Sequence, residues 1–211
     1  MTDGLNGPLI YAITDGSATA DDFDRATDRI LTLVRAAIAE EIAFIQVREK
    51  HLSGKQLFIL ASRCAKLTRG TSTRLVINDR ADIASAAGAD GVHLTEISVP
   101  VEVIRREFGS DLIIGASVHT SESARSANTA GADFVVYGPV FNTPGKGEAV
   151  GLESLARTCS FVAPFPVIGV GGIDASNCRS VIRAGAAGVA GIRSFGDRTS
   201  LSSITIALDH E

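Results

Sequence analysis

Eight short apolar runs recur along the 211 residues, and a longer segment with helical periodicity follows each one. The runs cover residues 9–13, 44–47, 75–77, 91–94, 112–115, 134–137, 166–170 and 188–192. Short runs of nearly continuous apolar character are typical of parallel strands that are covered on both faces. Strict alternation of strand and helix predicts an α/β fold, and eight units predict a closed (β/α)8 TIM barrel. An open, doubly wound sheet is the alternative.

The segments between these runs predict the helices. Asp21 and Asp22 can cap a helix that ends near residue 40, and Ser53 can cap the next one. Further helices are expected over 81–87, 101–108, 121–130, 152–159, 175–184 and 201–208. Asp174 or Ser176 would cap the helix over 175–184. Because no Pro- or Ser-rich linker divides the chain, we expect one barrel domain over residues 1–211.

One phrase, Ala-Gly-Ala, occurs at residues 87–89, 130–132 and 184–186, before the fourth, sixth and eighth predicted strands. The glycine of each copy (Gly88, Gly131, Gly185) can take the left-handed conformation that ends a helix at low cost. The repeat therefore belongs to the scaffold, at the N-terminal face of the strands. Chemistry in this fold lies at the opposite face, just past the C-terminal ends of the strands.

Charge and cysteine usage narrow the class of protein. Lys and Arg total 20 against 24 Asp and Glu, and this net charge of −4 argues against a general nucleic-acid binder. We interpret Cys64, Cys159 and Cys178, which lack metal-type spacing, as buried reduced thiols. The sequence also lacks a signal-peptide pattern and any run as long as a membrane span. The expectation is a cytoplasmic protein that binds neither membrane nor nucleic acid.

Two cations follow the second predicted strand in the stretch Gln46-Val-Arg48-Glu-Lys50. In an extended chain Gln46, Arg48 and Lys50 share one face. Cations on the inward side of a barrel strand are costly to bury unless an anion pairs with them, which predicts an anionic ligand. The alternative is a solvated strand end at which Glu49 neutralises one charge.

Polar side chains also follow the third and fifth predicted strands. Asn78 or Asp79 could cap the next helix, or Asp79 could hold a hard cation such as Mg²⁺. Ser117 and His119 place a hydroxyl and an imidazole at the rim. A histidine there is either structural or an acid–base group.

The chain after the sixth, seventh and eighth predicted strands suits phosphate. The first of these loops is long and contains Lys146 between two glycines, where it can reach an anion. The other two read Gly169-Val-Gly-Gly-Ile173 and Gly191-Ile-Arg-Ser194. Glycine amides approach an anion closely, and the loops after strands seven and eight are the recurrent phosphate site of TIM barrels.

These residues, in order and over nearly the whole chain, resemble the thiamine phosphate synthase family and its relative, the thiazole tautomerase. The motifs that carry the resemblance are IQVREK (45–50), INDR (77–80), DGVHL (90–94), GASVHT (115–120), ADFVVYGPVFNT (132–143), PVIGVGGI (166–173) and GAAGVAGIRS (185–194). The resemblance implies a (β/α)8 barrel and an enzyme of thiamine biosynthesis. This transferase joins a hydroxymethylpyrimidine diphosphate to a thiazole phosphate. Pyrophosphate leaves first, and the thiazole nitrogen captures the methylene cation.

The resemblance also implies a role for each matching residue. The pyrimidine diphosphate would contact Gln46, Arg48, Lys50 and Asn78. Its phosphates would also meet Ser117, Thr143 and Lys146, and Asp79 would ligate Mg²⁺. The thiazole phosphate would lie on the backbone of Gly171, Gly172, Ile192 and Arg193.

Two positions depart from the synthase pattern. Ser98 stands where the synthase carries a second carboxylate for Mg²⁺, and Glu96 is the candidate to replace it. The loop Asn142-Thr-Pro-Gly-Lys146 lacks one phosphate-binding hydroxyl of the synthase. Both changes are expected to weaken the grip on a magnesium diphosphate.

Two other functions remain open. In a thiazole tautomerase, a metal-independent isomerase, His119 would be the acid–base group, but synthases also carry this histidine. Gln46, Asn78 and Asp79 favour the synthase. A non-catalytic barrel that binds a thiamine precursor is the third reading, against which the basic residues argue. The oligomeric state, a homodimer included, is left open.

Overall fold

The structure, a computed structural model, describes residues 7–145 and 147–209, and it confirms the closed barrel. The eight parallel strands pair in chain order, and β8 returns to pair with β1. They are β1 (Leu9–Ile13), β2 (Phe44–Val47), β3 (Arg74–Asn78), β4 (Gly91–Leu94), β5 (Ile113–Val118), β6 (Phe134–Tyr137), β7 (Val167–Val170) and β8 (Gly188–Gly191).

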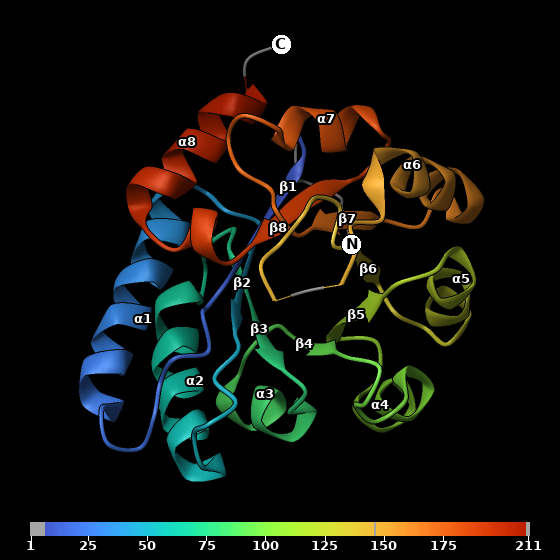
Figure 1. Cartoon of the computed structure of the whole chain (residues 1–211). Coiled ribbons are helices and arrows are strands. Elements are labelled where there is room, and N and C mark those ends of the chain that lie inside the picture. Colours follow the sequence, from blue (N-terminus) through green and yellow to red (C-terminus); the bar gives the residue numbers. More distant parts are fainter. Residues whose placement is uncertain (1–6, 146, 210–211) are drawn as a thin grey trace.

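A ring of helices surrounds the strands (Figure 1). The helices are α1 (Phe23–Ala39), α2 (Gly54–Thr68), α3 (Ala81–Ala87), α4 (Val101–Phe108), α5 (Ser121–Thr129), α6 (Gly151–Val162), α7 (Cys178–Arg183) and α8 (Arg198–Asp209). A short 3₁₀ helix, Arg193–Phe195, lies between β8 and α8. None of the helices in the described part of the chain combines the length and apolar character that crossing a bilayer requires.

The N-terminal ends of α1, α2 and α7 can be compared with the caps that the sequence predicts. Ser53 caps α2 as expected, in a reciprocal capping box with Gln56. The expected cap of α7 is wrong, since this helix begins only after Asn177. The Asp174 carboxylate instead accepts hydrogen bonds from the N–H and hydroxyl of Ser176, which shapes the preceding turn. At α1 the N-cap residue is Asp22, but its side chain accepts bonds from Thr19 rather than from the helix.

The repeated Ala-Gly-Ala phrase has the structural role that we expected. Gly88, Gly131 and Gly185 have φ angles of 73°, 96° and 93°, and each follows a helix and leads into β4, β6 or β8. A residue with a Cβ atom disfavours these angles, which explains why glycine occupies all three places. The phrase therefore terminates helices at the barrel floor.

The barrel has an outer and an inner core. The outer core packs the helices against the sheet, and the inner core fills the space inside the strands. Three aromatic rings dominate the inner core, where Tyr11 lies 5.5 Å from Phe44 and 5.7 Å from Phe134 between ring centroids. Because this floor is packed, the barrel is closed at its N-terminal side and only the C-terminal face can receive a ligand.

The three cysteines lie in the outer core, as expected. Cys64, Cys159 and Cys178 are buried free thiols. Burial raises the pKa of Cys64 to about 12 and that of Cys159 to about 11. Neither thiol is therefore activated as a nucleophile at neutral pH.

Candidate active site

The end of β2 directs polar groups into the barrel mouth. Gln46 faces inward and is 1% exposed, and its Nε2 has no hydrogen-bond partner among the described residues. Arg48, two positions further, is half-buried. Burial is the main cause that lowers the pKa of His93 on β4, and the charge of Arg48 adds to it, so the guanidinium acts on the barrel interior. A buried donor without an acceptor beside a cation prepares this side of the mouth for an oxygen-rich ligand.

Glu49 forms no ion pair with Arg48, Lys50 or any other cation of the described residues, so its expected role as a counter-ion is wrong. Its buried carboxylate accepts hydrogen bonds from the backbone N–H groups of Gly16 (3.3 Å) and Ala18 (2.9 Å). The N–H of Arg48 in turn donates to Thr14 Oγ1 at 2.8 Å. These bonds tie the loop after β1 to the end of β2 and hold Arg48 in place. Lys50, the second predicted cation, is exposed.

Glu49→Gln is expected to lower the free energy of unfolding by about 2 kcal/mol, because the amide NH₂ would face a backbone N–H where an acceptor is needed. Urea denaturation monitored by circular dichroism measures the change. Glu153→Gln is the matched control, since its carboxylate is 88% exposed in a surface ion pair with Arg157. Equal, small changes in the two variants would contradict the structural role of Glu49.

The carboxylate of Asp79 is the centre of an oxygen cluster between β3 and β4. Its Oδ2 accepts from Asn78 Nδ2 at 2.6 Å, and its Oδ1 accepts from the hydroxyls of Thr95 (3.3 Å) and Ser98. Asp79 has a φ of 61°, which is uncommon for a residue with a Cβ atom. Such local strain is held by the surrounding hydrogen bonds and is frequent at functional sites.

The cluster decides between two expectations for this segment. Neither Asn78 nor Asp79 caps α3, whose N-cap residue is Arg80. Glu96 is exposed and makes no hydrogen bond to Asp79, whereas Ser98 does. Among the described residues no group of three or more His, Cys, Asp or Glu side chains could enclose a metal ion. The Asp79 carboxylate and the hydroxyls of Thr95 and Ser98 are nonetheless oxygen ligands, which suit a hard cation. Asn78 presents its Nδ2 rather than an oxygen, and the cluster carries one negative charge instead of two.

His93 and Ser117 lie side by side on the inner faces of β4 and β5. His93 Nε2 is 2.9 Å from Ser117 Oγ, and the ring is 5% exposed. Burial lowers the pKa of His93 to about 4, the Asp79 charge opposes this shift, and the Arg48 charge adds to it. The imidazole is therefore neutral at physiological pH. Ser117 was expected after the strand, but β5 extends to Val118 and includes it.

His119 lies past the end of β5 and is exposed. Its Nδ1 is 2.8 Å from the carbonyl oxygen of Gly138, which follows β6. A carbonyl can only accept, so Nδ1 carries a proton in this contact, and Nε2 has no hydrogen-bond partner among the described residues. The ring is thus oriented as a base at the rim.

The loops after β6 and β7 are joined by backbone hydrogen bonds. The N–H groups of Val140 and Phe141 donate to the carbonyls of Val170 (2.8 Å) and Gly171 (3.0 Å). Thr143 lies in the same assembly, because a Cβ atom added to Gly171 would come within 3.3 Å of its hydroxyl. Lys146, the predicted lysine of this loop, lies outside the described residues.

Gly171 and Gly172 form a turn with exposed amides. Their φ angles are 97° and 64°, and a Cβ atom would come 2.5 Å from Pro139 at Gly171 and 2.7 Å from Phe141 at Gly172. Within the described ranges, the N–H groups of Gly171, Gly172 and Ile192 find no protein acceptor. Consecutive glycine amides in such a turn make a concave site for an anion. Arg193, exposed beside Ile192, adds a positive charge.

The predicted residues therefore gather in two groups at one face of the barrel. The first group, at the ends of β2 to β5, contains Arg48, Asp79 and Ser117 with their neighbours. The second contains the loops after β6, β7 and β8. Both groups follow strand C-termini, which all lie at the same end of a parallel barrel.

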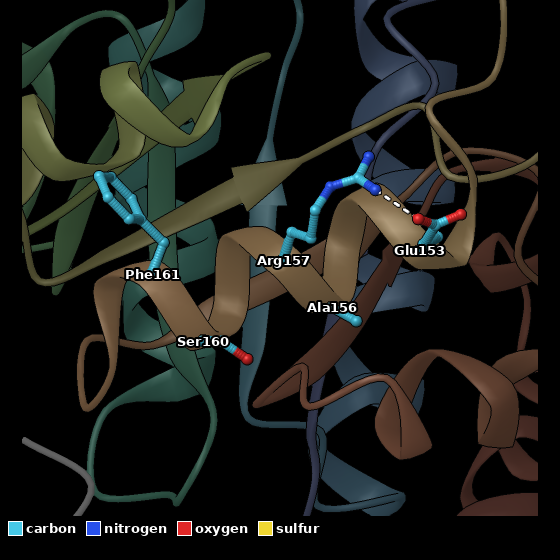
Figure 2. Close-up of a pocket in the computed structure, with 5 residues that line it drawn as sticks. All are labelled: Glu153, Ala156, Arg157, Ser160 and Phe161. Carbon is cyan, nitrogen blue, oxygen red and sulfur yellow. Dashed lines mark hydrogen bonds and ion pairs between the residues drawn. The ribbon is translucent and has the colours of Figure 1, made fainter.

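A surface hollow on α6 lies apart from these groups (Figure 2). It is lined by Glu153, Ala156, Arg157, Ser160 and Phe161. The outer face of the helix forms it, since Arg157 and Phe161 are exposed while Leu155 and Val162 point into the core. The hollow contains none of the residues predicted for the site.

Sequence reasoning gave no site role to three residues that shape the mouth, Thr14, His93 and Thr95, and it interpreted Glu49 only as a counter-ion. The two-residue period of the strands could have placed His93, because it faces inward two positions after Gly91. No sequence signal marks Thr14 or Thr95, since their partners lie in different loops.

Comparison with known proteins gives a consistent assignment. A family model described as thiamine monophosphate synthase matches residues 10–195. The thiamine-phosphate synthase of Roseiflexus sp. is 42% identical over 188 residues, which are 87% of this chain and 76% of that protein. The thiamine-phosphate synthase of Haloarcula marismortui is 41% identical, over 86% of this chain and 85% of that protein.

Solved structures extend the comparison to three dimensions. A thiamine phosphate pyrophosphorylase from Pyrococcus furiosus superposes with a TM-score of 0.79 at 30% identity and covers 94% of both chains. A 3-hexulose-6-phosphate synthase superposes with a TM-score of 0.69 at 18% identity, which shows likeness of fold alone.

Proposed function

The chain belongs to the thiamine monophosphate synthase family, and we propose that it joins a hydroxymethylpyrimidine diphosphate to a thiazole phosphate and releases pyrophosphate. One observation carries the proposal beyond family membership. A cationic, donor-rich group at the ends of β2 to β5 faces the same mouth as the glycine amides after β7 and β8. Two phosphorylated molecules need two such sites at one opening.

The first group binds the diphosphate substrate. Gln46 Nε2, buried without an acceptor, and Asn78 bind the pyrimidine side. Arg48 and Lys50 neutralise the diphosphate, and the Ser117 hydroxyl donates to it, with Thr143 and Lys146 closing from the loop after β6. When the bond from the pyrimidine methylene to the diphosphate oxygen breaks, the electron pair leaves with pyrophosphate. Fixed cations and donors stabilise that charge as it develops.

Asp79 is the residue that would hold Mg²⁺, with Ser98 and Thr95 as neutral oxygen neighbours. A bound Mg²⁺ supplies charge neutralisation to the leaving pyrophosphate. Because this chain offers one carboxylate at the cluster, most of the negative charge for the ion would come from the diphosphate itself.

The second group binds the thiazole phosphate on the amides of Gly171, Gly172 and Ile192 and beside Arg193. Held in this way, the thiazole nitrogen uses its lone pair to form the new C–N bond at the methylene carbon. No proton moves in this step, so the residues act by position and charge and not as a general base.

A coupling assay tests the proposal directly. Purified protein with Mg²⁺ and both phosphorylated precursors is expected to form thiamine phosphate, and EDTA is expected to lower the rate on the order of 100-fold or more. Chromatographic quantification of thiamine phosphate gives the rate.

Asp79→Asn should reproduce the effect of EDTA. Glu96→Gln, at an exposed residue without a bond to Asp79, is the matched control and should leave the rate unchanged. Absence of product under saturating substrates and metal refutes the synthase function.

The orientation of His119 supports a second candidate, a thiazole tautomerase. Its Nδ1 is held by Gly138 and its Nε2 is free to accept a proton at the rim. In that case isomerisation would persist in EDTA and disappear in His119→Ala. A barrel that binds a precursor without catalysis would bind thiazole phosphate but show neither reaction.

A further inference from the structure

His93 is a buried polar side chain of the mouth that the proposed reaction does not use. It lies on β4 against two aromatic rings, with centroid distances of 5.9 Å to Tyr11 and 6.4 Å to Phe134. Gly115 makes room for it, since a Cβ atom there would come 2.9 Å from His93 Nδ1 and 2.4 Å from the Phe134 ring. The surrounding side chains therefore hold the imidazole in one orientation, which fixes its contacts.

The ring has one hydrogen-bond partner. His93 Nε2 is 2.9 Å from Ser117 Oγ, whereas Nδ1 is buried with no partner among the described residues. A buried N–H without an acceptor costs more than a buried lone pair without a donor, because the donor has no other way to be satisfied. The favoured neutral tautomer therefore carries its proton on Nε2.

That tautomer determines what the serine can do. If Nε2–H donates, Ser117 Oγ is the acceptor in this bond, and its own proton remains available. Ser117 points inward like Gly115, two positions before it on β5. It is half-buried at the end of the strand, so the free O–H faces the mouth.

We propose that His93 is a positioning residue, which donates Nε2–H to Ser117 and thereby fixes the serine hydroxyl as a donor toward the pyrophosphate group. This role rests on the proposed function, because it assigns a diphosphate to the first group of residues. Three observations support this role: the contact between His93 Nε2 and Ser117 Oγ, the packing that fixes the ring, and the Nδ1 atom that has no partner among the described residues.

The opposite reading, a serine nucleophile activated by a histidine base, does not fit the geometry. Such a base is oriented by a third group at its other nitrogen. Here Nδ1 faces no carboxylate or carbonyl among the described residues. The contact between His93 and Ser117 therefore orients the serine hydroxyl as a donor and does not activate it as an alkoxide nucleophile.

Pyrophosphate binding in a double-mutant cycle tests the inference. Isothermal titration with inorganic pyrophosphate and Mg²⁺ is expected to show that Ser117→Ala weakens binding roughly 10- to 100-fold, as for loss of a hydrogen bond to a charged group. His93→Phe, which keeps a ring against Tyr11 and Phe134, should weaken it by about 10-fold. The double variant should bind pyrophosphate no more weakly than Ser117→Ala, because both substitutions act on the same donor, the serine hydroxyl.

A conservative variant separates positioning from packing. His93→Gln places an amide N–H close to the position of Nε2, so it should restore binding to within about threefold of the wild type. Additive losses in the double variant, or a glutamine variant as weak as His93→Phe, would overturn the inference. Thermal unfolding checks that each variant folds.

A measurement on the unaltered protein keeps the inference testable if the His93 variants do not fold. Long-range ¹H–¹⁵N spectra distinguish the two imidazole tautomers, and they should assign the His93 proton to Nε2. A proton on Nδ1 would refute it. If the protein forms thiamine phosphate but the losses of pyrophosphate binding are additive, the synthase function stands and the role of His93 is refuted. If the losses are non-additive but no thiamine phosphate forms, the role of His93 stands and the synthase function is refuted. If the wild type does not bind pyrophosphate, the role of His93 is refuted. If it also forms no thiamine phosphate, the synthase function is refuted as well.

Discussion

Arg48→Ala is expected to lower kcat by about 1,000-fold, the scale of loss for an arginine that stabilises a departing phosphate group. The guanidinium is half-buried at the end of β2, and its charge is felt by His93 inside the barrel. If Arg48 contacts the diphosphate as proposed, its removal would leave the developing charge of pyrophosphate without this cation. Initial-rate kinetics with each precursor varied in turn give kcat and both KM values.

Two further variants refine this result. Arg48→Lys should recover only part of the activity, because an ammonium group cannot reproduce the planar fork of donors. Arg63→Ala is the surface control, since Arg63 forms a solvent-exposed pair with Asp28 on the outer helices. Binding of thiazole phosphate should change little in Arg48→Ala. An equal loss of turnover and of thiazole phosphate binding would show that Arg48 does not belong to the diphosphate subsite.

Gly171→Ala is expected to lower the free energy of unfolding by about 3 kcal/mol and to weaken thiazole phosphate binding by about 10-fold or more. A φ of 97° strains any residue with a Cβ atom, and that atom would lie 2.5 Å from the Pro139 side chain and 2.6 Å from its Cα. Relief of the clash must move the loop that presents the amides. Urea denaturation and titration calorimetry measure the two effects.

Gly70→Ala is the matched control for this substitution. Gly70 has a similar φ of 78°, but nothing lies within 4 Å of its Cβ position, and it follows α2 on the outside of the barrel. Its cost should be about 1 kcal/mol, from the backbone angle alone. If the two alanine variants lose equal stability and bind thiazole phosphate equally, the close packing of Gly171 has no role in the site.

The scaffold could be predicted because its signals are local. Eight apolar runs fix the strands, and Gly88, Gly131 and Gly185 mark the helix ends that precede β4, β6 and β8. The ends of elements were less certain. β5 continues to Val118 because its small residues Gly115, Ala116 and Ser117 pair with β6, although none of them has strong strand propensity.

The site could be predicted only in part, because its partners are brought together by the closed sheet. The strand-end position of Asp79 is evident from the sequence, but its bonds to Thr95 and Ser98 join two loops. Likewise, Glu49 reads as a counter-ion when only its neighbours Arg48 and Lys50 are considered. Its actual partners are backbone amides more than 30 positions earlier in the chain.

The hydrogen bonds from Val140 and Phe141 to the last residue of β7 and the residue after it continue the pairing of β6 and β7 beyond the barrel rim. In the proposed site, this shared backbone would support contacts to both reactants. An insertion or deletion in either loop would displace both. Engineering this protein to accept a bulkier acceptor should therefore vary side chains and keep both loop lengths unchanged.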